Sequence, residues 1–133
     1  MAESSVLYRK DPVDVLICTK CRMGLAVENE ADRPGVKLHA ALADADLPEG
    51  VRLHAVECLS NCDHGCSVAL RGGPKRWTYV YGNLDCEPAS VDVIVEGATR
   101  YLETENGLVP WRDRPVHFRK NCIARIPPLE LPE

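Results

Sequence analysis

The chain has 133 residues, of which 45% are hydrophobic and 27% charged, and its formal net charge is −4. This length suggests one domain with a substantial core. The acidic balance argues against general nucleic-acid binding, which normally needs a clustered basic face. Because no apolar run approaches the length of a membrane span, we also expect no membrane partner.

Seven cysteines are the most informative feature of the composition. The segment that begins at Met1 shows no basic-then-apolar signal pattern, so we expect a cytoplasmic protein whose thiols stay reduced. Many cysteines in a reducing compartment favour a metal site over a disulfide framework.

The first predicted elements each lead to a group of cysteines. Residues 13–17 are apolar and β-branched and predict a buried strand that ends at Cys18. A helix is expected from Val36 to about residue 47. Residues 51–56 alternate as a second strand does and lead directly to Cys58.

Two strands joined by a crossover of this length are expected to be parallel, with a right-handed connection. The carboxyl ends of parallel strands lie at the same edge of a sheet, where ligands commonly bind. Cys18 and Cys58 both follow such an end. Chain topology therefore predicts that the two groups of cysteines meet in space.

The next elements are two strands joined by a hairpin. Residues 67–70 and 77–81 predict the strands, and Gly72-Gly73-Pro74 predicts the turn between them. Gly82-Asn83 is expected to turn the chain again.

A second helix is expected from Ser90, as its N-cap, to about residue 105. The predicted order is β-α-β-β-β-α in an α/β domain over residues 1–107.

Residues 108–133 differ from the rest because prolines interrupt them and basic residues are frequent. We interpret them as a Pro-rich, basic C-terminal arm, extended and packed on the domain or on a dimer partner. A docking arm for an acidic or phosphorylated partner is the alternative.

Four cysteines form two pairs with the spacing of metal ligands. Cys18 and Cys21 have a Cys-x2-Cys spacing, and Cys58 and Cys62 have a Cys-x3-Cys spacing. Thiolates are soft, charged donors for iron and zinc. Two pairs that each chelate one iron suit a [2Fe–2S] cluster held by four cysteines.

The remaining candidates are less clear. Cys66 opens the third strand and is either a ligand in place of Cys21 or a buried thiol. Cys86 and Cys122 stand alone and are expected not to be ligands. His64 lies within the second group, but a mixed histidine–cysteine site would need two histidines close together.

At this point the sequence resembles a known group of proteins. Val56-Glu57-Cys58-Leu59-Ser60-Asn61-Cys62, a strand, a hairpin with Tyr79-Val80-Tyr81-Gly82 and a final helix resemble the thioredoxin-like [2Fe–2S] ferredoxins over residues 13–105. More closely, residues 18–21, residues 58–66 and Ala124-Arg125-Ile126-Pro127-Pro128 resemble the DUF1636 group, described as predicted metal-binding proteins.

The resemblance implies a thioredoxin-like ferredoxin fold with a mixed sheet, a homodimer, and the ligands Cys18, Cys21, Cys58 and Cys62. Two features differ from the ferredoxin pattern. The first pair is more closely spaced, and Cys66 stands where many ferredoxins carry a proline. The fourth ligand therefore stays open between Cys21 and Cys66.

The leading hypothesis is a one-electron carrier, not an enzyme, which would take an electron from a reductase and pass it to an acceptor enzyme. The first alternative is a structural Zn²⁺-binding module, because four thiolates also suit zinc. The second is a thiol–disulfide oxidoreductase that uses Cys18-Thr19-Lys20-Cys21.

Overall fold

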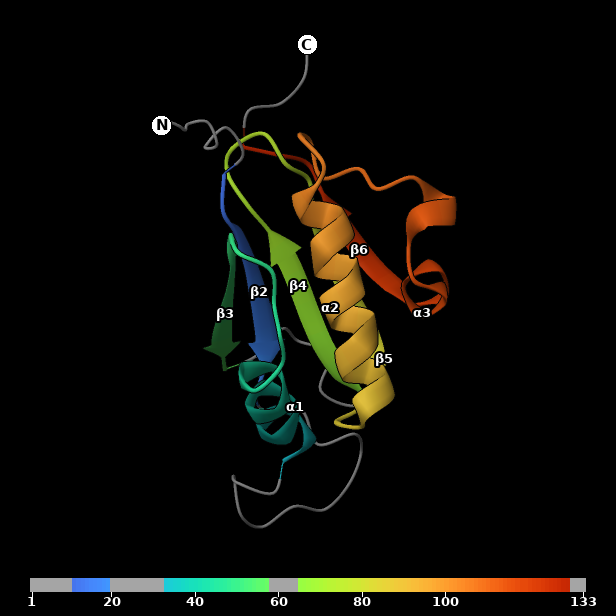
Figure 1. The fold of residues 1–133 in the computed structure, drawn as a ribbon. Coiled ribbons are helices and arrows are strands. Elements are labelled where there is room, and N and C mark those ends of the chain that lie inside the picture. Colours follow the sequence, from blue (N-terminus) through green and yellow to red (C-terminus); the bar gives the residue numbers. More distant parts are fainter. Residues whose placement is uncertain (1–10, 20–32, 58–64, 130–133) are drawn as a thin grey trace.

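A computed structural model describes residues 11–19, 33–57 and 65–129 as a mixed α/β fold (Figure 1). Its sheet has five strands in the order β3-β2-β4-β5-β6. The elements are β2 (Val13–Cys18), α1 (Pro34–Ala43), β3 (Val51–Val56), β4 (Cys66–Arg71), β5 (Thr78–Leu84), α2 (Pro88–Leu102), the 3-10 helix η3 (Trp111–Asp113), α3 (Val116–Lys120) and β6 (Cys122–Ile126).

The first two strands pair in parallel, as the sequence predicts. Val13 lies opposite Val51 and Cys18 lies opposite Val56, so both strands end at the same edge of the sheet. The other neighbouring pairs, β2–β4, β4–β5 and β5–β6, are antiparallel. The predicted order β-α-β-β-β-α is confirmed from β2 to α2.

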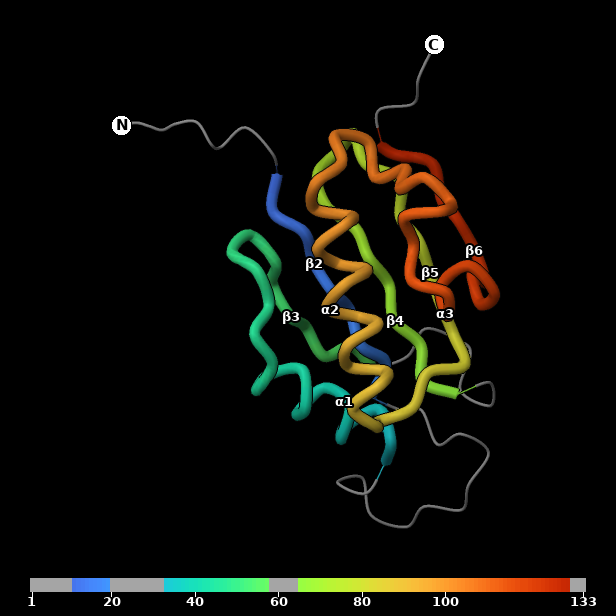
Figure 2. Tube along the Cα trace, turned by 45° about the vertical axis from the view of Figure 1, so that its right-hand side comes forward, coloured from blue at the N-terminus to red at the C-terminus, as the bar shows by residue number. Residues whose placement is uncertain are grey.

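Helices α1 and α2 lie against the same face of the sheet, and neither covers the opposite face (Figures 1 and 2). The core lies between these helices and the sheet. Apolar residues that recur at strand and helix spacing fill it: Val13, Val15, Ile17, Leu38, Leu42, Val68, Leu70, Tyr79, Tyr81, Ile94, Ala98 and Tyr101.

The start of α2 differs from the prediction. The helix begins at Pro88 with Glu87 as its N-cap, so Ser90 lies inside the first turn. The Ser90 hydroxyl instead donates a hydrogen bond to the Asp85 carboxylate at 2.8 Å and accepts one from the Asp85 backbone N–H at 3.1 Å. Proline at the first helical position replaces the capping signal that Ser90 was expected to give.

The turn predicted at Gly82-Asn83 is also wrong, because β5 continues through both residues to Leu84. Asn83 has a left-handed backbone, with φ of 57°, and the β4–β5 pairing shifts register between Cys66 and Val68. These turn-forming residues therefore mark a local irregularity within a strand pair and not the end of a strand.

The C-terminal segment packs against the rest of the fold through α3 and β6. Phe118 of α3 is buried, and its ring stacks on Tyr81 with the centroids 3.8 Å apart. A Cβ at Gly97 of α2 would collide with the same ring, so Phe118 fits closely against that helix. Strand β6 then adds to the edge of the sheet beside β5.

Candidate functional site

The cysteines of the described residues lie at one end of the sheet. Cys18 ends β2 and Cys66 begins β4, while Cys122 begins β6 and Cys86 follows β5 by two residues. Strands β2 and β5 run antiparallel to β4 and β6. The last residues of β2 and β5 and the first residues of β4 and β6 therefore lie at the same end of the sheet. The meeting of Cys18 and Cys21 with Cys58 and Cys62 stays a prediction, because only Cys18 of these four lies within the described residues.

Cys18 is held against the end of β3. Its thiol donates a hydrogen bond to the Glu57 carbonyl oxygen at 3.9 Å. The next residue, Thr19, donates twice to the Val56 carbonyl oxygen, from its backbone N–H at 2.8 Å and from its hydroxyl at 3.0 Å. Glu57, which follows β3 directly, therefore lies beside Cys18, and Cys58 is the next residue in the sequence.

The N-terminal end of α1 also lies against Cys18. Gly35, the second residue of this helix, is buried, and a Cβ there would overlap the carbonyl oxygen of Cys18. Only glycine permits this approach of the two backbones. Because a helix N-terminus carries a partial positive charge, α1 favours negative charge at this edge of the sheet.

Cys66 is the other candidate ligand that the structure describes. It is fully buried, belongs to the hydrophobic core and lies opposite Leu84 of β5. Cys18 is only 1% exposed, so burial alone does not distinguish a ligand from a core thiol at this edge. Gly65 precedes Cys66 with φ of +79°, and a Cβ there would lie 2.6 Å from the Asn83 Cα.

The other predicted ligands, Cys21, Cys58 and Cys62, lie outside the described residues, as does His64. Among the described residues, no group of three or more histidine, cysteine or acidic side chains could hold a metal ion. The four-cysteine ligand set stays a prediction.

The described part of this edge fits a metal held by thiolates in two respects. A buried thiol lies at the junction of β2, β3 and α1, and it bonds to the carbonyl oxygen of Glu57, the residue before the predicted ligand Cys58 in the sequence. In addition, the helix end beside it would stabilise the negative charge of a four-thiolate site.

The two cysteines without a predicted partner have different surroundings. Cys86 lines a shallow groove of about 270 Å³ between α1 and α2, with Ala41, Ala45 and Val91. Cys122 is exposed on β6, and its thiol bonds to the Ala124 carbonyl oxygen at 3.7 Å. Desolvation of the sulfur raises the pKa of Cys122, so this thiol stays protonated at neutral pH.

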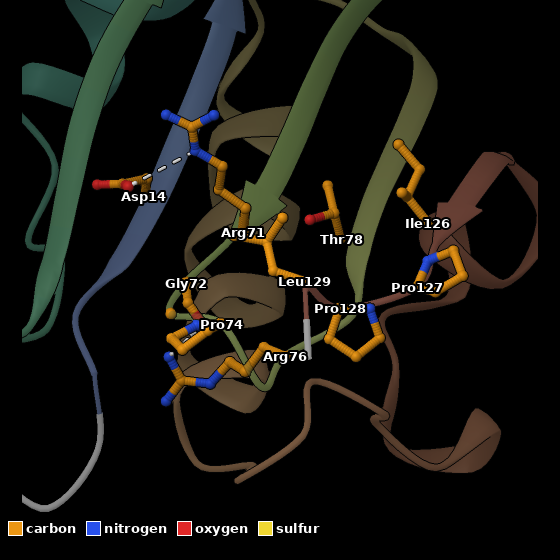
Figure 3. Close-up of a pocket in the computed structure, with 11 residues that line it drawn as sticks. Asp14, Arg71, Gly72, Pro74, Arg76, Thr78, Ile126, Pro127, Pro128 and Leu129 are labelled. Carbon is orange, nitrogen blue, oxygen red and sulfur yellow. Dashed lines mark hydrogen bonds and ion pairs between the residues drawn. The ribbon is translucent and has the colours of Figure 1, made fainter. Parts of the chain in front are cut away.

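A pocket that the sequence did not predict lies at the opposite end of the sheet (Figure 3). Its volume is about 470 Å³, and its walls come from the starts of β2 and β5, the ends of β4 and β6, and the hairpin at residues 72–76. Register places Asp14 opposite Arg71 and Thr78 opposite Ile126. Only the proline and glycine punctuation of these loops could have drawn attention to it.

Asp14 is the centre of an ion-pair network beside this pocket. Its carboxylate accepts hydrogen bonds from Arg52 at 2.8 Å and from His54 at 2.9 Å, and Arg71 lies 3.7 Å away. Burial alone would raise the pKa of Asp14, but the hydrogen bonds from Arg52 and His54 hold it below its usual value.

Figure 3 also shows Arg76, which is 4% exposed and belongs to the hairpin. Its guanidinium donates hydrogen bonds to the backbone carbonyls of Asp11, Gly72, Leu102 and Thr104. Desolvation lowers the pKa of Arg76. These bonds join the hairpin to the end of α2 and to the start of β2.

The described residues form a small mixed α/β protein in which strand ends bring several thiols to one end of a five-stranded sheet. The described helices include none that is long and apolar enough to span a membrane.

This chain belongs to the family described as "Protein of unknown function (DUF1636)", whose family model matches residues 15–128. No curated protein and no solved structure matches it.

Proposed function

We propose that this protein is a one-electron carrier with a [2Fe–2S] cluster held by Cys18, Cys58, Cys62 and either Cys21 or Cys66. The cluster, when bound, supplies one-electron redox chemistry. The chain supplies the thiolates, shields them from water and sets the local charge. We propose that its partners are a reductase and an acceptor enzyme, and that it acts in the cytoplasm.

One observation carries this proposal. The buried thiol of Cys18 bonds to the carbonyl oxygen of Glu57, the residue just before Cys58. Two segments 39 residues apart in sequence thus meet at one point on the sheet edge. Each of these segments contributes one of the two predicted ligand pairs.

The surroundings of Cys18 also support a negatively charged centre. The N-terminal end of α1 lies against this residue, and Gly35 permits the close approach. A helix dipole at this position would stabilise thiolates and would favour uptake of an electron. The Cys18 side chain is only 1% exposed, so little water screens the helix dipole at this position.

We further propose that the fold is a thioredoxin-like ferredoxin fold. The parallel pair β2–β3 with α1 between them in sequence, followed by antiparallel β4 and β5 and then α2, has the predicted order. Both helices on one face of a mixed sheet also agree with this proposal.

The decisive experiment is anaerobic purification followed by quantitation of iron, acid-labile sulfide and zinc per chain. We expect a red-brown protein with two irons and two sulfides, and a spectrum that bleaches on one-electron reduction. A colourless protein with one zinc per chain would support the structural zinc module instead.

Single serine substitutions identify the fourth ligand. If Cys21 is the ligand, Cys21→Ser loses iron and Cys66→Ser retains it; the reverse result assigns Cys66. Cys122→Ser is the matched control, because Cys122 lies at the same edge but on the outermost strand, and it should keep full iron and sulfide content.

The thiol–disulfide alternative is tested on metal-free protein. Reduction of a disulfide substrate such as insulin by an added small dithiol, at a rate far above that of the small dithiol alone, would favour it. If the proposed function holds, the metal-free protein shows only the background rate.

A further inference from the structure

A row of five side chains crosses the sheet at the end opposite the cysteines. Arg52 lies opposite Asp14, and Asp14 lies opposite Arg71. Arg71 ends β4 beside Thr78, which begins β5 and lies opposite Ile126. The neighbours of this row along β2, β4 and β5 belong to the core beneath the helices, so the row itself lies on the opposite face of the sheet.

Four members of this row, all except Arg52, line the pocket of about 470 Å³ shown in Figure 3. The chain that follows β6 adds an apolar wall made of Pro127, Pro128 and Leu129. Leu129 is 90% exposed and Ile126 is 51% exposed. A concave site of this size, with exposed apolar side chains beside a few polar groups, is typical of a small-ligand site.

Arg71 is the cation that this pocket offers to a ligand. The Asp14 carboxylate is already bound at 2.8 Å by Arg52 and at 2.9 Å by His54. The Arg71 Nε lies 3.7 Å from Asp14, too far for a hydrogen bond, and its side chain is 59% exposed. Among the described residues Asp14 is the only partner of the Arg71 guanidinium, so its terminal nitrogens can donate to a ligand.

Thr78 provides a second donor next to this guanidinium. Figure 3 shows its hydroxyl oxygen directed toward the side of the pocket that Arg71 forms. This hydroxyl makes no hydrogen bond to any other residue that the structure describes. A planar guanidinium with a hydroxyl beside it matches the two oxygens of a carboxylate.

The surrounding charges favour a ligand with a single negative charge. Arg71 and Arg76 line the pocket, whereas Asp14 is the one acidic residue among its lining, so positive charge exceeds negative charge there. The Asp11 carboxylate packs against Gly73 of the same hairpin. Two carboxylates this near would repel a dianion such as phosphate more strongly than a monoanion.

We propose that this pocket binds a small organic monocarboxylate with an apolar body. Arg71 and the Thr78 hydroxyl bind the carboxylate, and Pro128 and Leu129 cover the apolar body. The site goes beyond the proposed electron transfer and does not depend on it, because it lies at the other end of the sheet from Cys18.

The test titrates the full-length protein with defined probes and follows the backbone amide resonances of the pocket residues. 3-Phenylpropionate should give saturable shifts with a Kd below about 1 mM. The neutral 3-phenylpropanamide should bind about tenfold more weakly, because it lacks the charge that Arg71 recognises. Acetate and inorganic phosphate should also bind more weakly, since neither has an apolar body.

Substitutions assign the binding groups. Arg71→Gln should weaken 3-phenylpropionate binding about tenfold, and Thr78→Val, which removes the hydroxyl at nearly constant shape, should weaken it about fivefold. Leu129→Ser should narrow the difference between 3-phenylpropionate and acetate. Lys75→Gln is the matched control: it removes one positive charge from the same hairpin, does not line the pocket and should bind as the wild type does.

Thermal unfolding confirms that each variant is folded. Equal affinity for the acid and the amide, or equal affinity in Arg71→Gln and Lys75→Gln, overturns the proposal, as does a wild type without saturable shifts. Tighter binding of phosphate than of 3-phenylpropionate overturns the carboxylate as the ligand. Iron and sulfide content, measured separately, decides the proposed function independently of these results.

Discussion

At the scale of single residues, Arg76 shows how backbone carbonyls accommodate a buried charge, with the Asp11 carboxylate adding a favourable charge interaction. Four backbone carbonyls accept its hydrogen bonds, and the Tyr101 ring lies 5.6 Å from its guanidinium carbon. Such a group is costly to bury unless all of its donors are satisfied. Its acceptors include Leu102 and Thr104, at the negative end of the α2 dipole.

Replacing this side chain should therefore destabilise the protein strongly. We expect Arg76→Met to lower the free energy of unfolding by about 3 kcal/mol, because buried carbonyls lose their donors. Lys75→Met, on the same hairpin but exposed, should change it by less than about 0.5 kcal/mol. Urea denaturation measures both, and equal effects would contradict this account.

Asp14 should make the stability of the protein depend on pH. Its pKa is lower in the folded protein than in the unfolded chain, so its stabilising effect is present above about pH 4 and is lost as the pH falls through the folded pKa. At pH 7, Asp14→Asn should cost about 1 kcal/mol, since it weakens the pairs with Arg52 and His54.

The measurement is urea denaturation of wild type and Asp14→Asn from pH 7 down to pH 2. The two stabilities should converge at the acid end. Asp46→Asn, which removes an exposed carboxylate, controls for the loss of one negative charge. A difference between wild type and Asp14→Asn that persists unchanged at pH 2 would argue against the ion-pair network.

At the scale of elements, the position of α1 depends on Gly35. Alanine is a better helix former than glycine by about 1 kcal/mol, yet its Cβ at this position would overlap the Cys18 carbonyl. We expect Gly35→Ala to destabilise the protein by about 2 kcal/mol through this overlap, and to lower the iron content.

A second substitution on the same helix separates the two effects. Ala40→Gly should cost about 1 kcal/mol through helix propensity alone and should leave the iron content unchanged. Urea denaturation and iron per chain are measured for both variants. A gain of stability in Gly35→Ala would show that α1 does not pack against Cys18 in the manner described.

Elements with a strong periodic pattern were predictable from the sequence. Strand β3 has the predicted bounds, and β2 ends at Cys18 as expected. The signals that failed were local ones. Ser90 is a good N-cap residue, but Pro88 starts the helix earlier, and Gly82 and Asn83 are turn formers that β5 absorbs.

The candidate site was predictable only in part, because the sequence predicts the pairing of some strands and not of others. The spacing of Cys18 and Cys58 relative to strand ends predicts a shared edge, since parallel topology requires it. The location of Cys86 at that same end follows from the β4–β5 hairpin, which the sequence predicts, whereas that of Cys122 follows from the pairing of β6 with β5, which it does not. The pocket near Asp14 combines four strands and could not be assembled from local patterns.

At the scale of the whole molecule, the C-terminal segment is part of the folded unit. Phe118 is buried between Gly97 and Tyr81, and β6 completes the sheet. The prolines around it limit helix length, as expected, but they do not prevent a strand from forming between them.

Loss of the Phe118 ring should therefore affect global stability. We expect Phe118→Ala to lower the free energy of unfolding by about 3 kcal/mol, and the cavity between α2 and β5 accounts for this loss. Val116→Ala removes an exposed side chain from the same short helix and should be nearly neutral. Thermal and urea denaturation test the pair, and a neutral Phe118→Ala would show that α3 is not anchored on α2.

The hydrogen bonds from Thr19 to Val56 have a consequence for assembly. They join the end of β2 to the end of β3 through the backbone and the side chain of Thr19. If the protein holds the proposed cluster, we expect a chelator to remove the iron and to leave this strand junction folded. The circular dichroism of the emptied protein would then keep its strand and helix signals.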